Sequence, residues 1–466
     1  MKILNKSLLA VNGLISLGIV SQQTAISSGK NNNRPNFIII FCDDMGYGDL
    51  GVYGNPNIRT PNLDMMAFQG QKWTNFYVAA PVSTPSRAAL LTGRLPVRSG
   101  MSSEKRRVLF PDSNGGLPSS EITIARLLKE NGYHTAAVGK WHLGHKSPYL
   151  PSDHGFESYF GIPYSNDMDK IEKTDYLTLA ETERFQAYNV PLMRDDKIVE
   201  RPADQRTITR RYTEEIIDKI NSHKKEPFFL YLAHSFPHIP LYRSPEFKGR
   251  SKAGIYGDVI EEIDWSVGQI LETLQKEKIA DNTLVVFTSD NGPWLTYGTH
   301  GGSAGLLRGG KGGTFEGGMR EPAIFWWPGK IKPGVISEMA TTMDLLPVFC
   351  GLANVPVPDD RTYDGYNISP VIFGTGTNPR DVVLYYRDTE VFAVRKGAFK
   401  AHFITQAEYG SNDRTIHEPP LLYNLDNDPS EKHNIARENP EIITEIRKIL
   451  KEHLSTLVPV ENQLEK

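Results

Sequence analysis

The chain has 466 residues, of which 39% are hydrophobic and 23% charged, an ordinary balance for a globular protein with a large core. The formal net charge of −3 gives no global basic field that would attract nucleic acid, so any anion must be bound by a local cluster. The two cysteines, Cys42 and Cys350, exclude a disulfide framework and a zinc–cysteine cluster, and their apolar surroundings predict buried thiols.

The N-terminal residues have the pattern of a secretory signal peptide. Two lysines precede an apolar stretch over residues 8–20, and small and polar residues follow it. A membrane anchor is the alternative, but Asn12 interrupts the stretch, which is shorter than the ~20 residues needed to span a bilayer. We therefore predict a signal peptide at 1–27, a flexible leader at 28–35 and no membrane span in the mature protein. The low cysteine content favours export to a bacterial periplasm.

Apolar runs of strand length alternate with amphipathic segments in the next part of the chain. The runs predict strands at 36–42, 135–139, 227–233, 284–289 and 322–327. Helices are predicted at 60–70, 121–131, 207–222 and 259–278. Strands that alternate with helices indicate an α/β fold with a large, mostly parallel sheet sandwiched by helices.

After Pro356 the pattern changes to shorter strands. They are predicted at 381–386, 391–395, 399–404 and 421–425, followed by a helix at 440–454. We therefore predict a main domain over residues 36–355 and a smaller C-terminal α+β subdomain over residues 356–466, which contains an antiparallel sheet.

Polar residues follow four of the five predicted strands of the main domain at the point where each strand ends. They are Asp43 and Asp44, Lys140 and His142, His234 and His238, and Asp290 and Asn291. Ligands of open parallel sheets bind beyond the carboxyl ends of the strands, so we expect these side chains to share one site. One polar residue after a strand is common, but four such strands together predict a functional site.

The oxygen-bearing residues of this set predict a metal site. Its ligands would be Asp43, Asp44, Asp290 and Asn291. Oxygen ligands alone select a hard divalent cation such as Ca²⁺ over zinc or copper. A solvated turn is the alternative for Asp43 and Asp44, but a double charge directly after an apolar strand would be costly without a cation.

Two basic side chains indicate an anion next to the metal. Lys140 and His142 are two residues apart, so both face one bound anion if the strand continues through them. The segment 81–94 predicts a short helix that begins at Ser83 and stops at Gly93. It is an ordinary helix start, yet it places the Ser83 hydroxyl where free N–H groups and the helix dipole favour a tetrahedral anion. Arg87, one turn further on, can add a fixed charge.

The segment Gly305–Lys311 has the glycine and lysine spacing of a phosphate-binding P-loop. Gly312 stands where the P-loop requires a serine or threonine for magnesium, and no apolar strand leads into the segment. We therefore exclude nucleotide binding and predict a flexible, glycine-rich loop that brings Lys311 to an anion.

With these residues in view, the sequence resembles the type I sulfatases of the alkaline phosphatase superfamily over nearly the whole mature chain. The segment 83–94, which reads STPSRAALLTGR, is similar to the formylglycine signature of that family in its serine form. Further similar blocks lie at 42–51, 139–144 and 311–322, and the segment 161–167 resembles the arylsulfatase A branch most.

The resemblance implies a role for each polar residue. Ca²⁺ would be bound by Asp43, Asp44, Asp290, Asn291 and the modified Ser83. Arg87 and His142 would hold the formylglycine hydrate, and Lys140 and Lys311 the sulfate. His238, as an imidazolium, would protonate the leaving-group oxygen. Many relatives carry cysteine at position 83, and the serine here implies conversion to 3-oxoalanine (formylglycine) by an anaerobic, radical-type maturation enzyme.

The resemblance also implies hydrolysis of a sulfate ester on a carbohydrate, with a galacto-configured sugar favoured. We predict that the sugar is bound by Asn166, Asp167 and His300, beside a rim of Tyr149, Tyr164, Trp294 and Tyr297. Two alternatives stay open: a phosphatase or phosphodiesterase of the same superfamily with an unmodified serine, and a non-catalytic glycan-binding relative.

Overall fold

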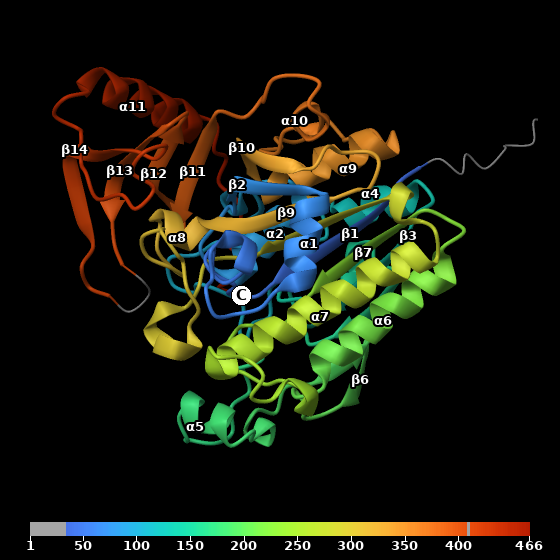
Figure 1. The fold of residues 1–466 in the computed structure, drawn as a ribbon. Helices are drawn as coiled ribbons and strands as arrows, with labels where there is room; N and C mark the ends of the chain where they lie inside the picture. The colour runs from blue at the N-terminus through green and yellow to red at the C-terminus, as the bar shows by residue number, and fades with distance from the viewer. Residues whose placement is uncertain (1–33, 408–410) are drawn as a thin grey trace, which may run out of the picture. The chain divides into compact units, whose positions relative to one another are not determined.

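The apolar run that follows the leader, Asn36–Cys42, lies in the middle of a ten-stranded sheet (Figure 1). The computed structural model describes residues 34–407 and 411–466, so the predicted signal peptide and most of the leader lie outside the described residues. The strands are β1 (Asn36–Cys42), β2 (Gln71–Tyr77), β3 (His134–Gly139), β4 (Ser158–Gly161), β5 (Leu192–Arg194), β6 (Lys197–Glu200), β7 (Phe228–Ala233), β8 (Thr283–Ser289), β9 (Arg320–Trp326) and β10 (Gly334–Thr341).

The strand order is β10-β2-β9-β8-β1-β7-β3-β4-β5-β6. Pairing is parallel from β8 through β1, β7 and β3 to β4, and between β10 and β2. The reversed strands are β9, between β2 and β8, and β5, between β4 and β6, which leaves eight of the ten strands pointing the same way. The predicted mostly parallel sheet is confirmed, and the predicted strand 322–327 is the reversed β9.

Helices cover both faces of the sheet, as predicted. One face is covered by α1 (Pro61–Gln69), α6 (Ile208–His223) and α7 (Gly254–Lys276), and the other by α2 (Ser83–Thr92), α4 (Ile124–Glu130) and α9 (Leu345–Ala353). The shorter helices are α3 (Pro96–Ser99), α5 (Tyr176–Glu181), α8 (Glu316–Met319) and α10 (Ser369–Phe373). None of the helices within residues 34–407 and 411–466 is long and apolar enough to cross a bilayer.

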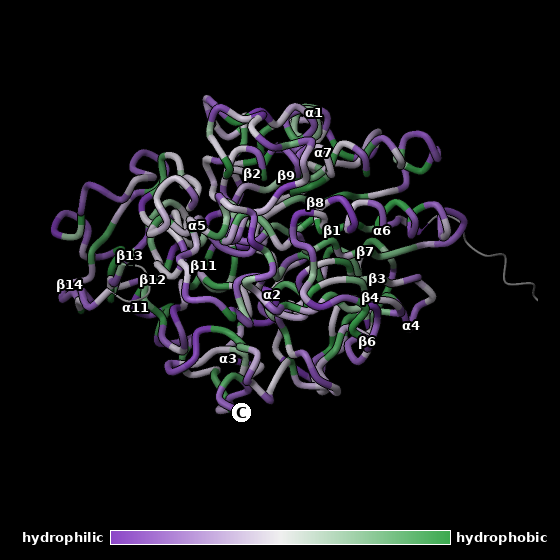
Figure 2. Tube along the Cα trace, turned by 90° about the horizontal axis from the view of Figure 1, so that it is seen from below, coloured by the Kyte–Doolittle hydropathy of each residue, from purple (hydrophilic) through white to green (hydrophobic). Residues whose placement is uncertain are grey.

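The alternation of side chains along β1 explains the three layers. Ile38 and Ile40 pack into the hydrophobic core under α6 and α7, whereas Phe37 and Ile39 pack into the core on the opposite face. The ring centroids of Phe37 and Phe349 lie 4.4 Å apart in a stacked arrangement. A strand that is buried on both faces reads as a continuous apolar run, which is why the sequence predicts it well. Figure 2 shows hydrophobic residues along these central strands.

The C-terminal residues form a second, antiparallel sheet. Its strands follow in the order β11 (Val382–Arg387), β12 (Glu390–Lys396), β13 (Phe399–Thr405) and β14 (Thr415–Asn424), and α11 (Pro440–Ser455) packs against it. The predicted antiparallel sheet and helix are confirmed, although β14 begins at Thr415 rather than at 421. Residues Arg34–Lys466 form one compact unit, so the domain boundary at 356 stays a prediction.

Candidate active site

The carboxyl ends of β1, β3, β7 and β8 meet at one edge of the sheet. The N–H of Asp290 donates to the Cys42 carbonyl at 3.0 Å, and the N–H of Lys140 donates to the Ala233 carbonyl at 2.7 Å. These hydrogen bonds fix the positions of the residues that follow neighbouring strands relative to one another. The sequence-predicted residues at these ends are therefore brought together, and both cysteines are buried as predicted.

Three carboxylates in this place pair with three cationic side chains. Lys140 Nζ lies 2.6 Å from Asp43 Oδ2, and Lys311 Nζ lies 2.8 Å from Asp44 Oδ2. Arg87 bridges two carboxylates, at 2.7 Å from Asp290 and 3.4 Å from Asp43. Burial would raise the pKa of Asp43, but Lys140 and Arg87 hold it below its usual range. Burial raises the pKa of Asp44 to about 7 despite Lys311.

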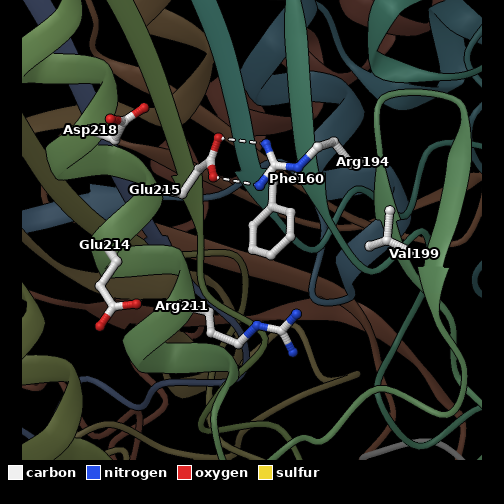
Figure 3. A pocket seen from close by; sticks show the side chains of 7 residues that line it. All are labelled: Phe160, Arg194, Val199, Arg211, Glu214, Glu215 and Asp218. Atoms are coloured by element: carbon white, nitrogen blue, oxygen red, sulfur yellow. Dashed lines mark hydrogen bonds and ion pairs between the residues drawn. The ribbon is translucent and has the colours of Figure 1, made fainter.

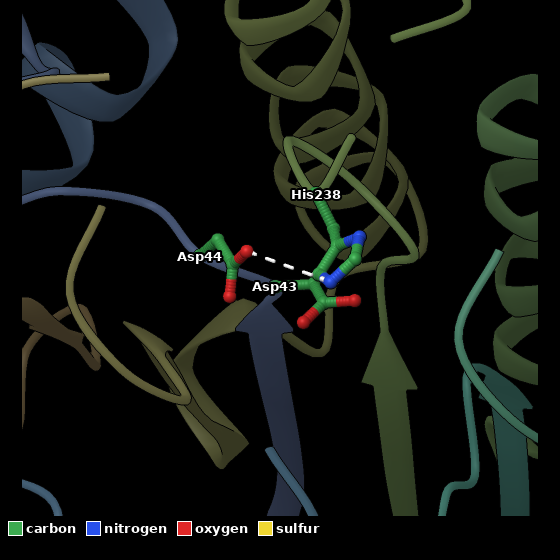
Figure 4. Close-up of side chains that lie close together, drawn as sticks. All are labelled: Asp43, Asp44 and His238. Carbon is green, nitrogen blue, oxygen red and sulfur yellow. Dashed lines mark ion pairs between the residues drawn. The ribbon is translucent and has the colours of Figure 1, made fainter. Parts of the chain in front are cut away.

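The oxygen atoms present fit a calcium ion. Asn291 Oδ1 is buried and has no hydrogen-bond partner, while the Asn291 amide nitrogen donates to Asp44 Oδ1 at 2.7 Å. One ligand atom each from Asp43, Asp44 and His238 lie within 4.8 Å of one another. Figure 4 shows these three side chains close together. Carboxylate oxygens beside an orphaned amide oxygen match the donors that Ca²⁺ prefers.

Ser83 faces the carboxylates from the first turn of α2. It is the first helical residue and Val82 precedes it as the cap without a side-chain bond. The Ser83 hydroxyl donates to Asp43 Oδ1 at 3.1 Å and accepts from Lys140 Nζ at 3.2 Å. The predicted stop at Gly93 is confirmed, and its φ of 67° suits glycine.

The strand predicted at 135–139 does not continue through Lys140 and His142, so the condition for both side chains to share one strand face is not met. β3 stops at Gly139, and His142 has a φ of 58°. The Nε2 atom of His142 lies 2.9 Å from the Leu109 carbonyl. A carbonyl can only accept, so Nε2 carries the proton and the buried, unpartnered Nδ1 is an acceptor. Burial and the charge of Lys140 lower the pKa of His142 well below its ordinary value.

His238 lies next to Asp44. Its Nε2 is 3.6 Å from Asp44 Oδ2, and its Nδ1 bonds to the Ile239 carbonyl. Burial, followed by the charges of Lys311 and Lys140, lowers the pKa of His238 well below its ordinary value. These charges disfavour the imidazolium that the resemblance implies for His238.

Ser165 is a site residue that the sequence analysis missed. Its hydroxyl lies 3.3 Å from both Lys140 Nζ and His238 Nε2. A single serine next to Asn166 and Asp167 carries no signal of its own, because only the fold places it between two predicted site residues.

The predicted sugar-binding residues lie in different surroundings. The Asn166 amide nitrogen donates to Gln205 Oε1 and to the Pro240 carbonyl, each at 3.0 Å. Burial raises the pKa of Asp167, whereas the charges of Lys311 and Lys140 lower it. His300 lies instead near Glu181 and Arg243, as the charges that act on its pKa show. A role of these three residues in sugar binding stays a prediction.

The aromatic rim is only partly at the site. The Trp294 ring lies 4.0 Å from Lys311 Nζ and 5.3 Å from the His238 ring, so it borders the site. Tyr164 is buried and donates to Asp169, which is a packing role. Tyr297 packs edge-on against Trp294 at 4.8 Å between ring centroids.

The glycine-rich loop is tied down in the structure. The N–H of Lys311 donates to the Pro293 carbonyl and that of Gly312 to the Pro81 carbonyl, both at 2.9 Å. A Cβ atom on Gly317 would lie 2.2 Å from the Gly309 carbonyl oxygen. The glycines therefore permit close packing of backbone on backbone, rather than the flexibility predicted from the sequence.

A cavity of about 410 Å³ at the far end of the sheet is not part of this site (Figure 3). It is lined by Phe160, Arg194, Val199, Arg211, Glu214, Glu215 and Asp218. Arg194 and Glu215 form a paired, two-point contact at 3.0 and 2.8 Å. None of the predicted site residues lines this cavity.

Comparison with known proteins agrees with the fold and with the family that the sequence resembles. A family model described as sulfatase matches residues 35–355, and one described as the C-terminal region of aryl-sulfatase matches residues 378–466. Arylsulfatase A of Bos taurus is 42% identical over 442 residues, with 90% of this chain and 86% of the relative covered. N-acetylgalactosamine-6-sulfatase of Homo sapiens is 39% identical over 469 residues, with 92% and 87% covered.

Solved structures with a similar fold include a sulfatase. PsFucS1 sulfatase from Pseudoalteromonas sp. matches with a TM-score of 0.81 and 28% identity, with 92% of each chain covered. Ps i-CgsB in complex with k-i-k-neocarrahexaose matches with a TM-score of 0.77 and 33% identity, with 92% of this chain and 95% of that chain covered. The chain belongs to the sulfatase family. It is accordingly a sulfuric ester hydrolase, similar to arylsulfatase A over most of its length.

Proposed function

We propose that the protein removes sulfate from a carbohydrate and that Ser83, converted to formylglycine, is its nucleophilic residue. The observation that carries the proposal is the position of Ser83, whose hydroxyl lies 3.1 Å from Asp43 and 3.2 Å from Lys140 at the start of α2. Ca²⁺ would be held by Asp43, Asp44, Asp290, Asn291 and the modified residue 83. Bound there, Ca²⁺ supplies a Lewis acid, and formylglycine supplies a carbon that carries two hydroxyl groups.

The surrounding side chains would bind and orient the sulfate group. Lys140 and Lys311 carry their charges at 2.6 and 2.8 Å from Asp43 and Asp44, so both ammonium groups already point into the site. Arg87 is held in place by its ion pair with Asp290. Its charge would offset the negative charge that develops on the sulfuryl oxygens. The unpartnered Nδ1 of His142 would accept a hydrogen bond from residue 83.

His238 would donate the proton to the leaving oxygen. Burial, followed by the charges of Lys311 and Lys140, lowers the pKa of its imidazole. An anionic sulfate ester held by these two lysines neutralises their charges, which favours protonation of Nε2 at the moment when an acid is needed. The Ser165 hydroxyl, at 3.3 Å, would keep the imidazole ring in place.

Removal of the metal tests the reaction class. Chelation should abolish hydrolysis of sulfate esters, and Ca²⁺ should restore it, because the site would lose the Lewis acid that the proposal requires. Sulfate and phosphate esters of one leaving group should be assayed side by side, with thermal unfolding as the control that the chelated protein stays folded. A preference for the phosphate ester, or recovery with Zn²⁺ but not with Ca²⁺, would contradict the proposal.

For the substrate we propose a galacto-configured sugar sulfate at a chain end. Support comes from the relative named N-acetylgalactosamine-6-sulfatase and from the Trp294 ring beside His238, which offers a face for stacking on a sugar. Sulfated galactose, N-acetylgalactosamine, glucosamine and fucose should be compared as monosaccharides and as internal polymer units. We expect selective hydrolysis of the galacto-configured monosaccharides. A steryl sulfate belongs in the same panel, because human steryl-sulfatase is 36% identical, and selective hydrolysis of it or of internal units would refute the proposal.

We also propose export to a bacterial periplasm and maturation by an anaerobic, radical-type enzyme. The basic residues and the apolar stretch over residues 8–20 support the export signal. Serine rather than cysteine at position 83 supports that maturation route.

A further inference from the structure

Buried charges meet where the C-terminal sheet contacts the loop that carries Lys311. Lys400 on β13 is completely buried, and its Nζ lies 2.9 Å from Glu316 Oε1 and 3.0 Å from Glu431 Oε1. Its third bond goes to the Thr314 carbonyl at 2.8 Å. The ammonium group thus donates hydrogen bonds to Glu316 and Thr314 and forms an ion pair with Glu431, all inside the protein.

The two carboxylates around Lys400 are themselves fully bonded. Glu316 accepts from the Tyr77 and Tyr385 hydroxyls at 2.7 and 2.6 Å. Glu431 Oε2 accepts from the backbone N–H of Glu316 at 2.7 Å. Burial would raise the pKa of Glu316, but the charges of Lys400, Arg320 and Arg395 keep it below its usual range. Glu316 is therefore ionised, and the geometry of the cluster is fixed from several elements.

Ser430 and Glu431 also contact the beginning of the loop that carries Lys311. The Arg308 guanidinium donates to the Glu431 carbonyl at 3.1 Å, and the Ser430 hydroxyl donates to the Leu306 carbonyl at 2.6 Å. Lys311 lies between these contacts and the Lys400 bond to Thr314. Hydrogen bonds from the C-terminal sheet and from the turn after it therefore hold the loop on both sides of Lys311.

We propose that Lys400 and Glu431 are positioning residues for Lys311. They fix the loop 306–316 at both ends, so that Lys311 Nζ reaches Asp44 at 2.8 Å and lies 4.0 Å from the Trp294 ring. Neither residue touches the proposed sulfate position. The inference rests on the anion-binding role proposed above for Lys311.

A double-mutant cycle tests this role. Lys400→Met should lower kcat/KM for a sulfate ester by about 10²-fold, because displacement of a binding group by about 1 Å costs that much. It should also weaken inhibition by inorganic sulfate. In a Lys311→Ala background the same change should cost little further activity, because the group that it positions is already absent.

Arg380→Met is the matched control. Arg380 forms a buried ion pair with Asp344, with Nε at 2.9 Å from Oδ2, and its other hydrogen bonds go to the Val382 and Asp364 carbonyls rather than to the loop. This variant should lower Tm as Lys400→Met does and leave kcat/KM unchanged. If Lys400→Met does not fold, Glu431→Gln is used in the same cycle, since it keeps an acceptor for the Glu316 N–H.

The outcomes separate the two proposals. A loss on Lys400→Met that is as large in the Lys311→Ala background as in the wild type overturns the positioning role alone. An equal loss of kcat/KM in Arg380→Met does the same, because the effect would then reflect stability. Unchanged kcat/KM and sulfate inhibition in Lys311→Ala itself would overturn the proposed role of Lys311, and the inference with it.

Discussion

Replacing Ser83 with alanine should reduce sulfate ester hydrolysis on the order of 10⁶-fold, the size of loss seen when a nucleophile that acts together with its neighbours is removed. The variant keeps Asp43, Lys140 and Arg87 but lacks the oxygen of residue 83 that would attack sulfur. Initial rates on an activated aryl sulfate measure the loss. In active wild-type protein, peptide mass spectrometry should find that residue 83 lacks two hydrogens relative to serine.

Ser266→Ala is the control, because this serine is equally buried, in α7, and its hydroxyl bonds to Thr213 rather than to a site residue. It should change activity little. Full activity with an intact, unoxidised Ser83 would rule out the formylglycine mechanism and favour the phosphatase-like alternative.

Replacing His238 with alanine should give a loss that depends on the leaving group. Sugar sulfates should lose roughly 10²- to 10⁴-fold in kcat/KM, the usual contribution of a general acid. Activated aryl sulfates should lose far less, because their leaving oxygen is stable without a proton. The measurement is kcat/KM for the variant on one sugar sulfate and on a series of aryl sulfates of increasing leaving-group pKa.

His234→Ala provides the comparison for this series. His234 also follows β7 and is also buried, but its Nε2 lies 3.5 Å from the Ser266 hydroxyl of α7, away from the carboxylates. Any loss that it causes should be equal for all leaving groups. The same flat dependence in His238→Ala would remove the acid role from His238.

The sequence predicts the central sheet and most of the polar site, for one physical reason. Strands that are buried on both faces read as apolar runs, and parallel strands bring their ends together. β2 does not read as a continuous apolar run, because the half-buried Lys72 and Thr74 interrupt its apolar residues. β9 reads as one more strand of the set although it is reversed, so its site residue, Lys311, precedes the strand instead of following it.

The supporting residues could not be predicted in the same way. Lys400 and Glu431 look like ordinary surface charges in the sequence, and only the contact between the second sheet and the loop buries them. Ser165 was missed for a related reason, since its role depends on two residues that are distant in the chain. His234 is the opposite case. It follows a predicted strand, as His238 does, but its side chain packs against α7 instead of lying at the site.

The buried Lys400 cluster also bears on the order of events during synthesis. A chain that is made and exported N-terminus first can begin to fold there, so β1, β3, β7 and β8 can assemble with their helices before β13 is present. Until Lys400 and Glu431 arrive, Glu316 would lack the counter-charge of Lys400, and the glycine-rich loop would lack its contacts with the C-terminal residues. The nascent protein would therefore contain a nearly complete sheet with an unfinished anion site, and the last strands to be translated would complete it.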